Sequence, residues 1–489
     1  MPALSPSLYF TVLFSLFALR SLYILTPPST PLPDCDEVFN YYEPLHFLLF
    51  GKGLQTWEYA PEYALRTAAF LNPLYLILSP LSGISTIPKP ALFHLARLLL
   101  SLFTSCAEAS LFTSLYTTLS PSIAYTTLLL LAPTAGMYHA SASFLPSSLA
   151  LTLTIFATAA HLNRSYFSAI FYGLLAVTML GWPFVAILYI PLGLHSLYAS
   201  YYNKHAKKDS DRQLATIVTL LFAVFTLVFF SFVAAVQDYR FYGKITIPNV
   251  NIFLYNAIGG ATDEAGAKTG DELYGVEPAM YYVKNLVVNA ALVPFLAAMY
   301  PVLYVVKAVV GRNATEQDHV CFTIFVPLLL WFGLLFSRPH KEERFLFPVY
   351  HLLAFGGAMT LDMVGKWGGR GVKIVVPSLI GLSAVLSFGR IGALAHNYGA
   401  PVAVYTALYD RLVERGGGGV NVCVGGEWHR FPSHFFLTDN ASLRFVESGF
   451  GGQLPQMFTE GGSKVVSRAR KRGPRACVNT RTCVRHVHV

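Results

Sequence analysis

The sequence predicts a polytopic α-helical membrane protein. Only 12% of its 489 residues are charged and 54% are hydrophobic, whereas an ordinary soluble protein is about 25% charged. A soluble chain of this length would need about three domains, each with its own charged surface, and the charges present are too few to cover them. Apolar runs also recur along the chain, many of them close to the roughly 20 residues that cross a bilayer.

We expect about 11 transmembrane helices, give or take one or two, because the apolar runs between 123 and 200 are short and closely joined. The first run is too long and too poor in basic residues for a signal peptide, so we interpret it as an uncleaved anchor. The expected spans are 7–26, 91–117, 123–140, 143–160, 166–181, 183–200, 213–236, 285–309, 318–337, 344–362 and 373–389.

The sidedness follows from three basic connecting loops, at 203–212, 307–312 and 365–373. Basic residues accumulate on the cytoplasmic side of membrane proteins, and counting spans puts all three loops on one side. The long loop at 27–90 and the carboxyl-terminal residues after 390 then face the opposite compartment. Nearly all polar, chemically rich segments fall on that non-cytoplasmic side, which favours an enzyme with a site at the membrane surface.

The formal charge of +9 is not a nucleic-acid signal. Residues 461–489 hold eight of the 35 Lys and Arg and no acidic residue, so the rest of the chain has 27 bases against 26 acids. We interpret this basic tail as disordered or as an artefact of gene prediction. The sequence accordingly divides into a first transmembrane helix (1–26), a loop with interfacial helices (27–90), a multi-span region (91–389), a small domain (390–460) and the tail (461–489).

The first loop is rich in carboxylates, with Asp34, Asp36, Glu37 and Glu43 within ten residues. From about 37 to 50 the pattern predicts an amphipathic helix in the interface plane. We expect its polar face to be turned away from the membrane. A partly desolvated carboxylate can act as a general base, although a solvated acidic loop is the alternative. The spacing is not that of an EF-hand calcium loop, and the cysteines show no zinc spacing, so we predict no metal.

The segment Ser337–Phe345 (SRPHKEERF) concentrates charge between two expected spans. Its bases can bind a lipid phosphate, with Glu342 and Glu343 orienting them. The alternative is an interfacial belt whose side chains extend to the headgroups.

After the last span, Val420–Gly425 predicts a β-strand within a small domain of about 70 residues. Asn440 begins an Asn-Ala-Ser sequon on the non-cytoplasmic side and is a candidate glycosylation site.

Several segments together carry a family resemblance. DCDEVFNYYEPLHFLLFGKGLQTWEY in the first loop, SASFLPSS, LGWPF, HKEERFLFP and VCVGGEWHRFPSHFF occur in this order from about 34 to 454. The chain resembles the dolichyl-phosphate-mannose-dependent α-1,2-mannosyltransferases of asparagine-linked glycan assembly, which belong to glycosyltransferase family 22 and the GT-C superfamily. The residues 461–489 do not follow this pattern.

The resemblance implies a GT-C fold with a long first luminal loop that bears the catalytic carboxylate. It implies inverting transfer of mannose from dolichyl-phosphate β-mannose, in α-1,2 linkage, to the six- and eight-mannose intermediates of a dolichyl-diphosphate-linked oligosaccharide. It places the protein in the endoplasmic reticulum membrane with a luminal active site. It implies the two lipid substrates and membrane lipid as partners, no cofactor and no nucleic acid.

Roles for individual residues follow from placing this chemistry on the motifs. We expect Asp36 to be the base, with Glu37 as the fallback. We expect His340, Lys341 and Arg344 to contact the donor phosphate. Candidates for shaping the substrate pocket are Asp34, Glu43, His46, Trp57, Glu58, Glu342 and Glu343.

Two other function classes stay open on the residues alone. A glycosylphosphatidylinositol-anchor mannosyltransferase shares donor and site, and differs in the acceptor. A membrane transporter would show internal repeats and charges in mid-span; Arg97, Glu108 and Asp362 are almost the only such charges.

Overall fold

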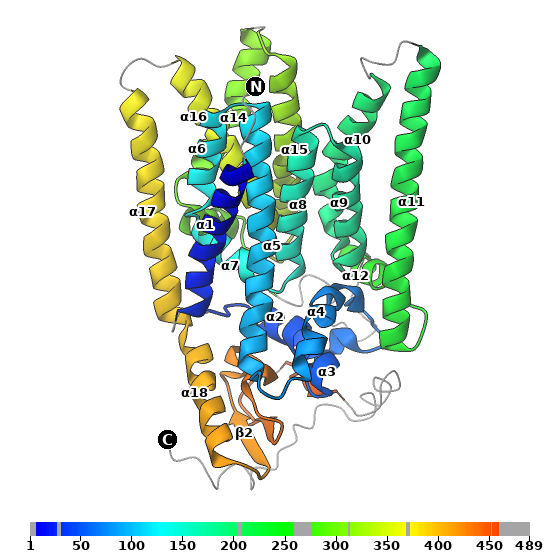
Figure 1. Ribbon diagram of the computed structural model, residues 1–489, viewed down its shortest axis with the longest axis vertical. Coiled ribbons are helices and arrows are strands. Elements are labelled where there is room, and N and C mark those ends of the chain that lie inside the picture. Colours follow the sequence, from blue (N-terminus) through cyan, green and yellow to red (C-terminus); the bar gives the residue numbers. More distant parts are fainter. Residues whose placement is uncertain are drawn as a thin grey trace. The chain divides into compact units, whose positions relative to one another are not determined.

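The computed structural model describes residues 6–26, 31–202, 208–258, 275–311, 313–367, 372–450 and 452–458. The basic tail predicted at 461–489 lies outside these residues. The described chain is predominantly helical, as predicted, and is shown in Figure 1.

Within these ranges, eight helices are long and apolar enough to cross a membrane, and nine if one bent pair counts as a single span. The eight comprise α1 (Pro6–Leu25), α5 (Lys89–Thr118), η4 (Pro183–Val185) with α10 (Ala186–Tyr201), α11 (Asp209–Tyr242), α14 (Val293–Val305) with η6 (Val306–Val310), α15 (Glu316–Ser337), η7 (Glu343–Val349) with α16 (Tyr350–Trp367) as far as Lys366, and α17 (Val372–Tyr398) from Ile374 onward. The expected number of 11 is therefore not confirmed.

The difference arises mainly where the expected spans were short. The segment predicted as 123–140 forms α6 (Pro121–Leu131) and α7 (Ala135–Ala142), and α9 (Tyr166–Met179) has only 14 residues. α7 and α8 (Pro146–Leu162) meet at an angle of 105°. The break falls at Pro146, because the residue before a proline avoids the helical conformation, and Leu145 is extended there.

The chain forms two compact units. One unit comprises 1–21, 100–233 and 252–392, and the other comprises 22–99, 234–251 and 393–489. The boundaries fall inside continuous helices, including α5 and α11.

The first unit is a helical bundle in which α8, α9 and α10 lie side by side (Figure 1). α14 packs along α16, and the other helices of the unit include α12 (Pro248–Ile258, which begins in the second unit) and α13 (Met280–Ala290). α7 approaches α16 so closely that a Cβ on Gly136 would lie 2.5 Å from the ring of Tyr350. Only glycine permits this contact.

Charges inside the spans of the first unit are paired. Arg20 of α1 and Glu108 of α5 form a fully buried ion pair, supported by a hydrogen bond from Arg20 to Ser105. Asp362 of α16 pairs with Lys366 one turn later at 2.6 Å. Pairing removes most of the cost of placing a charge among apolar side chains, so these residues are explained by helix packing.

The second unit joins the first loop to the carboxyl-terminal segment. The first loop folds into α2 (Cys35–Glu37), a π-helical turn η1 (Val38–Tyr42), α3 (Glu43–Phe50), β1 (Leu54–Gln55), η2 (Trp57–Tyr59), η3 (Ala68–Phe70) and α4 (Asn72–Ser82). The carboxyl-terminal segment folds into α18 (Ala400–Arg415), β2 (Val420–Val424), η8 (Trp428–Arg430), η9 (His434–Phe436), β3 (Ala441–Phe445) and β4 (Gln456–Met457).

Two small sheets hold this unit together. β1 pairs with β4 in antiparallel register, and β2 pairs with β3 in parallel register. The strand predicted at 420–425 is thus confirmed, although it is only half-buried. A shared apolar cluster includes Val38 and Phe39 from the first loop and Phe431, Leu437 and Leu443 from the carboxyl-terminal segment.

Candidate active site

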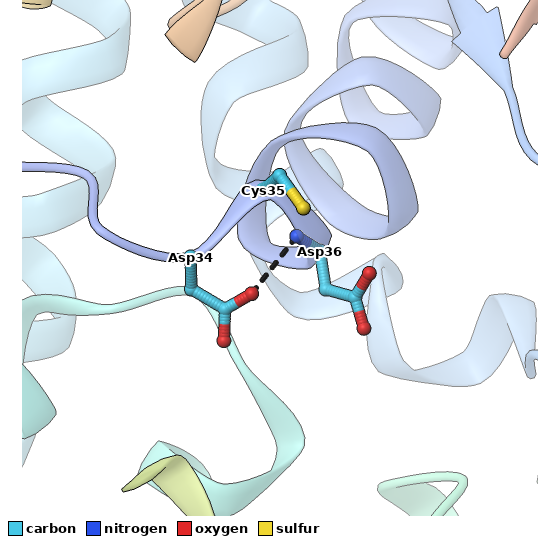
Figure 2. A group of neighbouring side chains, drawn as sticks. All are labelled: Asp34, Cys35 and Asp36. Atoms are coloured by element: carbon cyan, nitrogen blue, oxygen red, sulfur yellow. Dashed lines mark hydrogen bonds between the residues drawn. The ribbon is translucent and has the colours of Figure 1, made fainter. Parts of the chain in front are cut away.

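The acidic start of the first loop is fixed by a helix cap. The Asp34 carboxylate accepts a hydrogen bond from the Asp36 N–H at 2.9 Å and so caps α2. Figure 2 shows Asp34, Cys35 and Asp36 in this arrangement. One ligand atom from each of the three lies within 4.8 Å of the others, so a metal ion is geometrically conceivable here although the sequence predicted none. All three residues are only partly buried.

Asp36 is the accessible carboxylate of the pair predicted to contain the base. Its side chain is 33% exposed, and its Oδ2 lies 3.9 Å from Nη2 of Arg66. That distance is too long for a hydrogen bond but short enough for charge attraction. The Asp36 carboxylate therefore lies beside the positive charge of Arg66 at a distance beyond hydrogen bonding.

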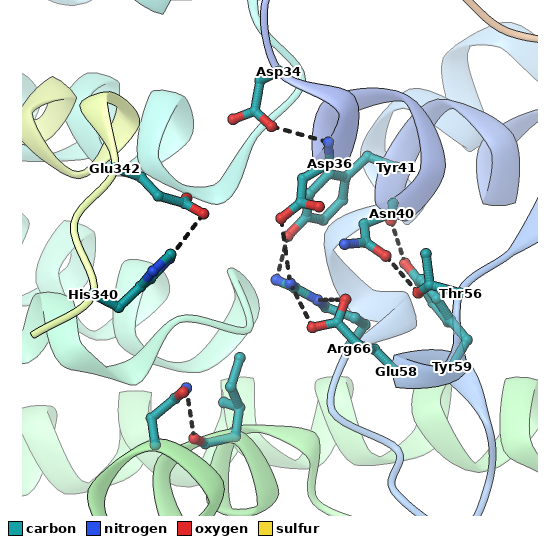
Figure 3. A network of polar contacts seen from close by, with 12 residues as sticks. Asp34, Asp36, Asn40, Tyr41, Thr56, Glu58, Tyr59, Arg66, His340 and Glu342 are labelled. Atoms are coloured by element: carbon teal, nitrogen blue, oxygen red, sulfur yellow. Dashed lines mark hydrogen bonds and ion pairs between the residues drawn. The ribbon is translucent and has the colours of Figure 1, made fainter. Parts of the chain in front are cut away.

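Arg66 is itself held by other partners (Figure 3). Its Nε and Nη2 donate to the two carboxylate oxygens of Glu58 at 3.1 and 2.9 Å, and its Nη1 donates to the Tyr41 hydroxyl at 2.9 Å. Although burial would lower the pKa of Arg66, the charge of Glu58 raises it well above its ordinary value, so Arg66 is cationic. Glu58, predicted as a pocket residue, is thus the anchor of Arg66.

Glu37, the fallback base, has a different environment. It is fully buried and its Oε1 accepts a hydrogen bond from Nη1 of Arg97 at 3.0 Å, with both side chains 0% exposed. A carboxylate that is enclosed and paired with a guanidinium is a poor proton acceptor. Of the two neighbouring carboxylates, Glu37 is therefore the less accessible.

A second set of contacts braces the loop behind Asp36. The Thr56 hydroxyl donates to the side chain of Asn40 and the Tyr59 hydroxyl donates to its carbonyl, both at 2.6 Å (Figure 3). Burial raises the pKa of Tyr59 well above its ordinary value, so this hydroxyl stays a donor. The contacts connect η1 to η2 and fix the loop between them.

Glu43 lies at the junction of the first loop with the carboxyl-terminal segment. Its carboxylate accepts hydrogen bonds from the Leu54 N–H (2.8 Å), the Ser433 hydroxyl (2.8 Å) and the His434 N–H (2.7 Å), and lies 2.6 Å from Nδ1 of His434. Burial alone would raise the pKa of Glu43, but His434 lowers it to about 2. We expected Glu43 on an outward polar face; the structure buries it completely.

His46 follows the same pattern. It is fully buried, and its Nδ1 contacts the carbonyl of Lys52. Burial, followed by the charge of Lys89, lowers the pKa of His46 well below its ordinary value, so the ring is neutral. The prediction that the polar face of 37–50 is exposed is wrong, because the carboxyl-terminal segment covers this face and supplies partners to its polar groups.

Trp57, another predicted pocket residue, is half-buried at the start of η2. Its ring contacts that of Tyr63 edge-on, with centroids 5.0 Å apart.

The segment Ser337–Phe345 lies in the first unit, where Glu342 accepts from two bases. His340 Nε2 lies 3.0 Å from Glu342 Oε1 (Figure 3). Arg344 forms an ion pair with the other oxygen of Glu342. Burial alone would lower the pKa of His340, but the hydrogen bond to Glu342 raises it. Glu342 thus contacts two of the bases that it was expected to orient.

Lys341 and Glu343 point elsewhere. The Lys341 ammonium donates to the carbonyl of Arg338 and its side chain is buried. Glu343 interacts with Asn289 and Arg390. Phe345, at the end of the segment, packs against Trp182 with ring centroids 5.6 Å apart.

Sequence reasoning missed Arg66 and Asp238. Asp238 is buried and accepts hydrogen bonds from the Thr67 hydroxyl at 2.9 Å and from the Ala68 N–H at 2.7 Å, which fixes the chain just after Arg66. Arg66 could have been suspected because it is a base eight residues after an acidic one in a loop packed with aromatics. The sequence gives no such signal for Asp238, because it lies 170 residues after Ala68, whose N–H it binds.

Asn440, the candidate glycosylation site, is exposed and immediately precedes β3. Its carbonyl accepts a hydrogen bond from the Val420 N–H at 3.0 Å.

The first loop and the segment 337–345 offer different chemistry. The first loop presents a partly exposed carboxylate beside a fixed cation, which suits proton abstraction. The segment 337–345 presents two oriented bases, which suit a phosphate.

The fold defines the class of the protein. ArnT from Cupriavidus metallidurans, in its crystal structure bound to undecaprenyl phosphate, matches with a TM-score of 0.57 at 12% identity, covering 90% of this chain and 85% of that one. The oligosaccharyltransferase of Archaeoglobus fulgidus in the apo form matches with a TM-score of 0.50, covering 88% of this chain and 64% of that one. The chain is a multi-pass membrane protein with the GT-C glycosyltransferase fold.

Residues 11–438 match the Alg9-like mannosyltransferase family. Alpha-1,2-mannosyltransferase ALG9 of Saccharomyces cerevisiae is 35% identical over 468 residues, covering 92% of this chain and 78% of the relative. The ALG9 enzyme of Homo sapiens is 32% identical, covering 88% and 70%. GPI mannosyltransferase 3 of Debaryomyces hansenii is 25% identical, covering 77% and 63%. The chain belongs to the Alg9-like mannosyltransferase family and is an enzyme.

Proposed function

We propose that this enzyme transfers mannose from dolichyl-phosphate β-mannose, in α-1,2 linkage, to the six- and eight-mannose intermediates of a dolichyl-diphosphate-linked oligosaccharide for protein N-glycosylation. The site faces the lumen of the endoplasmic reticulum. The relatives of the α-1,2 type cover most of the chain at 31 to 35% identity, whereas the glycosylphosphatidylinositol enzyme is at 25%.

In this reaction, the 2-hydroxyl oxygen of the acceptor mannose attacks C1 of the donor mannose. The bond from C1 to the phosphate oxygen breaks, and its electron pair leaves with dolichyl phosphate. The hydroxyl proton passes to the Asp36 carboxylate. A single in-line displacement inverts the β linkage to α, and no covalent intermediate with the enzyme is needed.

The leaving group determines what else the site must supply. The leaving group is dolichyl phosphate, a phosphate monoester whose departing oxygen needs no proton, so cations that offset its growing negative charge replace a general acid. Arg344 and His340 supply these charges. Lys341 contributes by shaping the segment, since its ammonium already donates to a carbonyl.

The observation that carries the proposal is the difference between the two neighbouring carboxylates. The Asp36 side chain is 33% exposed, whereas Glu37 is fully buried and paired with Arg97. A general base must be accessible to the acceptor hydroxyl, and of these two carboxylates Asp36 is the one with an exposed side chain.

The test is mannose transfer by the purified enzyme in detergent, with dolichyl-phosphate mannose as donor. Two acceptors are offered separately: the six-mannose lipid-linked oligosaccharide and a glycosylphosphatidylinositol intermediate. We expect product on the first alone, sensitive to an α-1,2-mannosidase. Product on the second alone would replace the acceptor in the proposal, and a folded enzyme inactive on both would refute it.

The role of Asp36 is tested by Asp36→Asn. We expect the variant to fold and insert normally and to lose about 10²-fold or more in kcat, as for a general base. Near-normal turnover would remove Asp36 from this role.

A further inference from the structure

We propose that the amino-terminal end of α8 binds the phosphate of the lipid-linked mannose donor, through the helix dipole and the buried hydroxyls of Ser147 and Ser148. This inference rests on the proposed function, in which Arg344 and His340 contact the same phosphate. It gives a binding role to the SASFLPSS segment (141–148), which the proposed function leaves without one.

The amino-terminal end of α8 has no cap. Its N-cap residue, Leu145, is extended and makes no side-chain cap hydrogen bond, and the first turn contains no acidic residue. Helices usually begin with a polar cap and often carry an acidic residue in the first turn, because both offset the positive end of the helix dipole. That end, equivalent to about half an elementary charge, receives no negative charge from α8 itself.

Two serine hydroxyls lie in the first turn of this helix. Ser147 and Ser148 are each 3% exposed, and neither hydroxyl has a hydrogen-bond partner within the described residues. Side chains on a helix lean toward its amino terminus, so both hydroxyls are directed to the positive end of the dipole. An unpaired buried hydroxyl costs stability, and native proteins rarely keep one without a structural or functional reason.

The chemistry of this helix end selects an anion. A serine hydroxyl donates readily to an anionic oxygen, and helix amino termini bind phosphate groups through the same dipole. A sugar hydroxyl or a peptide carbonyl would pair with the serines but would gain little from the dipole. A phosphate oxygen uses both, and the exclusion of water strengthens its hydrogen bonds.

The first unit brings this part of the chain close to the segment that carries Arg344. η7, which includes Arg344, packs against both α7 and α8. The ring of His139, one turn before the break between α7 and α8, lies with its centroid 5.7 Å from that of Phe347 in η7. The start of α8 and the start of η7 therefore belong to one neighbourhood, in which both can contribute to a single phosphate site.

The first test is steady-state kinetics of the purified full-length enzyme carrying Ser147→Ala, Ser148→Ala or both. In the double variant we expect the KM for the donor to rise about 10-fold or more, because two hydrogen bonds to a charged group are lost, and the KM for the acceptor to change by less. An unchanged KM for the donor would overturn the inference. A rise confined to the KM for the acceptor would overturn it too, because the helix end would then bind the acceptor diphosphate.

The matched control for these variants is Ser196→Ala. Ser196 is fully buried in α10 of the same unit, but its hydroxyl donates to the Leu192 carbonyl at 2.7 Å. This substitution removes a buried hydroxyl of the same kind away from the proposed site, so both KM values should stay at their wild-type levels.

The second test measures binding without turnover. Dolichyl phosphate should raise the Tm of the wild type in detergent, and this increase should be smaller in the Ser147→Ala/Ser148→Ala variant. Dolichol, which lacks the phosphate, should change the Tm of both proteins equally. Without ligand, the double variant should be at least as stable as the wild type, because it loses two buried hydroxyls that have no partner.

Two results of the second test would contradict the inference. An equal increase in Tm with dolichyl phosphate in both proteins would remove the serines from the phosphate site. A lower Tm of the ligand-free double variant would show that the hydroxyls serve the folded structure instead of a ligand.

The two tests separate this inference from the proposed function. If the wild type transfers no mannose but dolichyl phosphate still stabilises it in a way that depends on Ser147 and Ser148, the proposed function fails and the phosphate site stands. If the wild type transfers mannose and the double variant matches it in both tests, the proposed function stands and this inference fails.

Discussion

Replacing Glu43 by Gln should destabilise the second unit substantially without changing its surface. The carboxylate is fully buried and accepts three hydrogen bonds, besides its contact with Nδ1 of His434. The amide of Gln keeps one acceptor oxygen but turns an NH₂ group toward donors. Two contacts are lost in this way, and hydrogen bonds to a charged group contribute about 1.5–3 kcal/mol each. The expected loss is about 3–5 kcal/mol, which matches the cost of removing one partner of a buried ion pair.

The pKa of Glu43 gives a second route to the same magnitude. Although burial opposes it, His434 lowers the pKa from 4.5 to about 2, and this difference corresponds to about 3 kcal/mol at neutral pH. Because the folded-state pKa is below the unfolded value, the stabilisation is complete above pH 4.5 and is lost as the pH falls from there toward 2. Glu43→Gln should therefore lower the stability at pH 7 and also reduce its loss on acidification.

The assay is thermal unfolding of the purified protein in detergent at pH 7 and at about pH 4, with Glu427→Gln as an exposed control. For a unit of this size, 1 kcal/mol moves Tm by about 2–4 °C, so a decrease of about 6–20 °C is expected at pH 7. A Tm within about 2 °C of the wild type, or an unchanged response to acid, would refute the reasoning.

The remaining predictions concern the other charged contacts. Glu37→Gln should reduce the free energy of unfolding by about 3–5 kcal/mol, because it leaves Arg97 buried without its ion partner. The double variant Glu37→Met/Arg97→Met should recover much of that loss, and thermal unfolding measures both. A Glu37→Gln variant that is stable but inactive would return Glu37 to the catalytic role. Arg344→Gln should raise the KM for the donor about 10-fold or more and the KM for the acceptor by less, since a hydrogen bond to a charged group contributes about 1.5–3 kcal/mol. An unchanged KM for the donor in steady-state kinetics would assign Arg344 to the interfacial belt. Asp238→Asn should weaken the segment after Arg66 and increase hydrogen exchange at Ala68, whose N–H it binds; unchanged exchange would argue against that anchor.

Local patterns predicted the parts of the fold that depend on neighbouring residues. The spans follow from runs of apolar side chains, and the strand at 420–424 from β-branched residues. The number of spans did not follow, because whether α6, α7 and α9 cross or end early depends on what they pack against. The amphipathic segment 37–50 was predicted as a helix and is one, but the predicted exposure of its polar face depended on a surface that the carboxyl-terminal segment covers.

The sequence by itself determined the class of protein, its multi-pass membrane character and the two charged segments in which the chemistry is proposed to lie, because composition and motif order are properties of the chain. It could not distinguish the carboxylates of the first loop from one another, since all are acidic residues in one short stretch. Tertiary structure decided this by supplying partners: Glu37 meets Arg97, which is 60 residues away, and Glu43 meets His434, which is 391 residues away. Asp36 alone among these three keeps a partly exposed side chain. A pKa and a role depend on neighbours in space, and only the folded chain determines those neighbours.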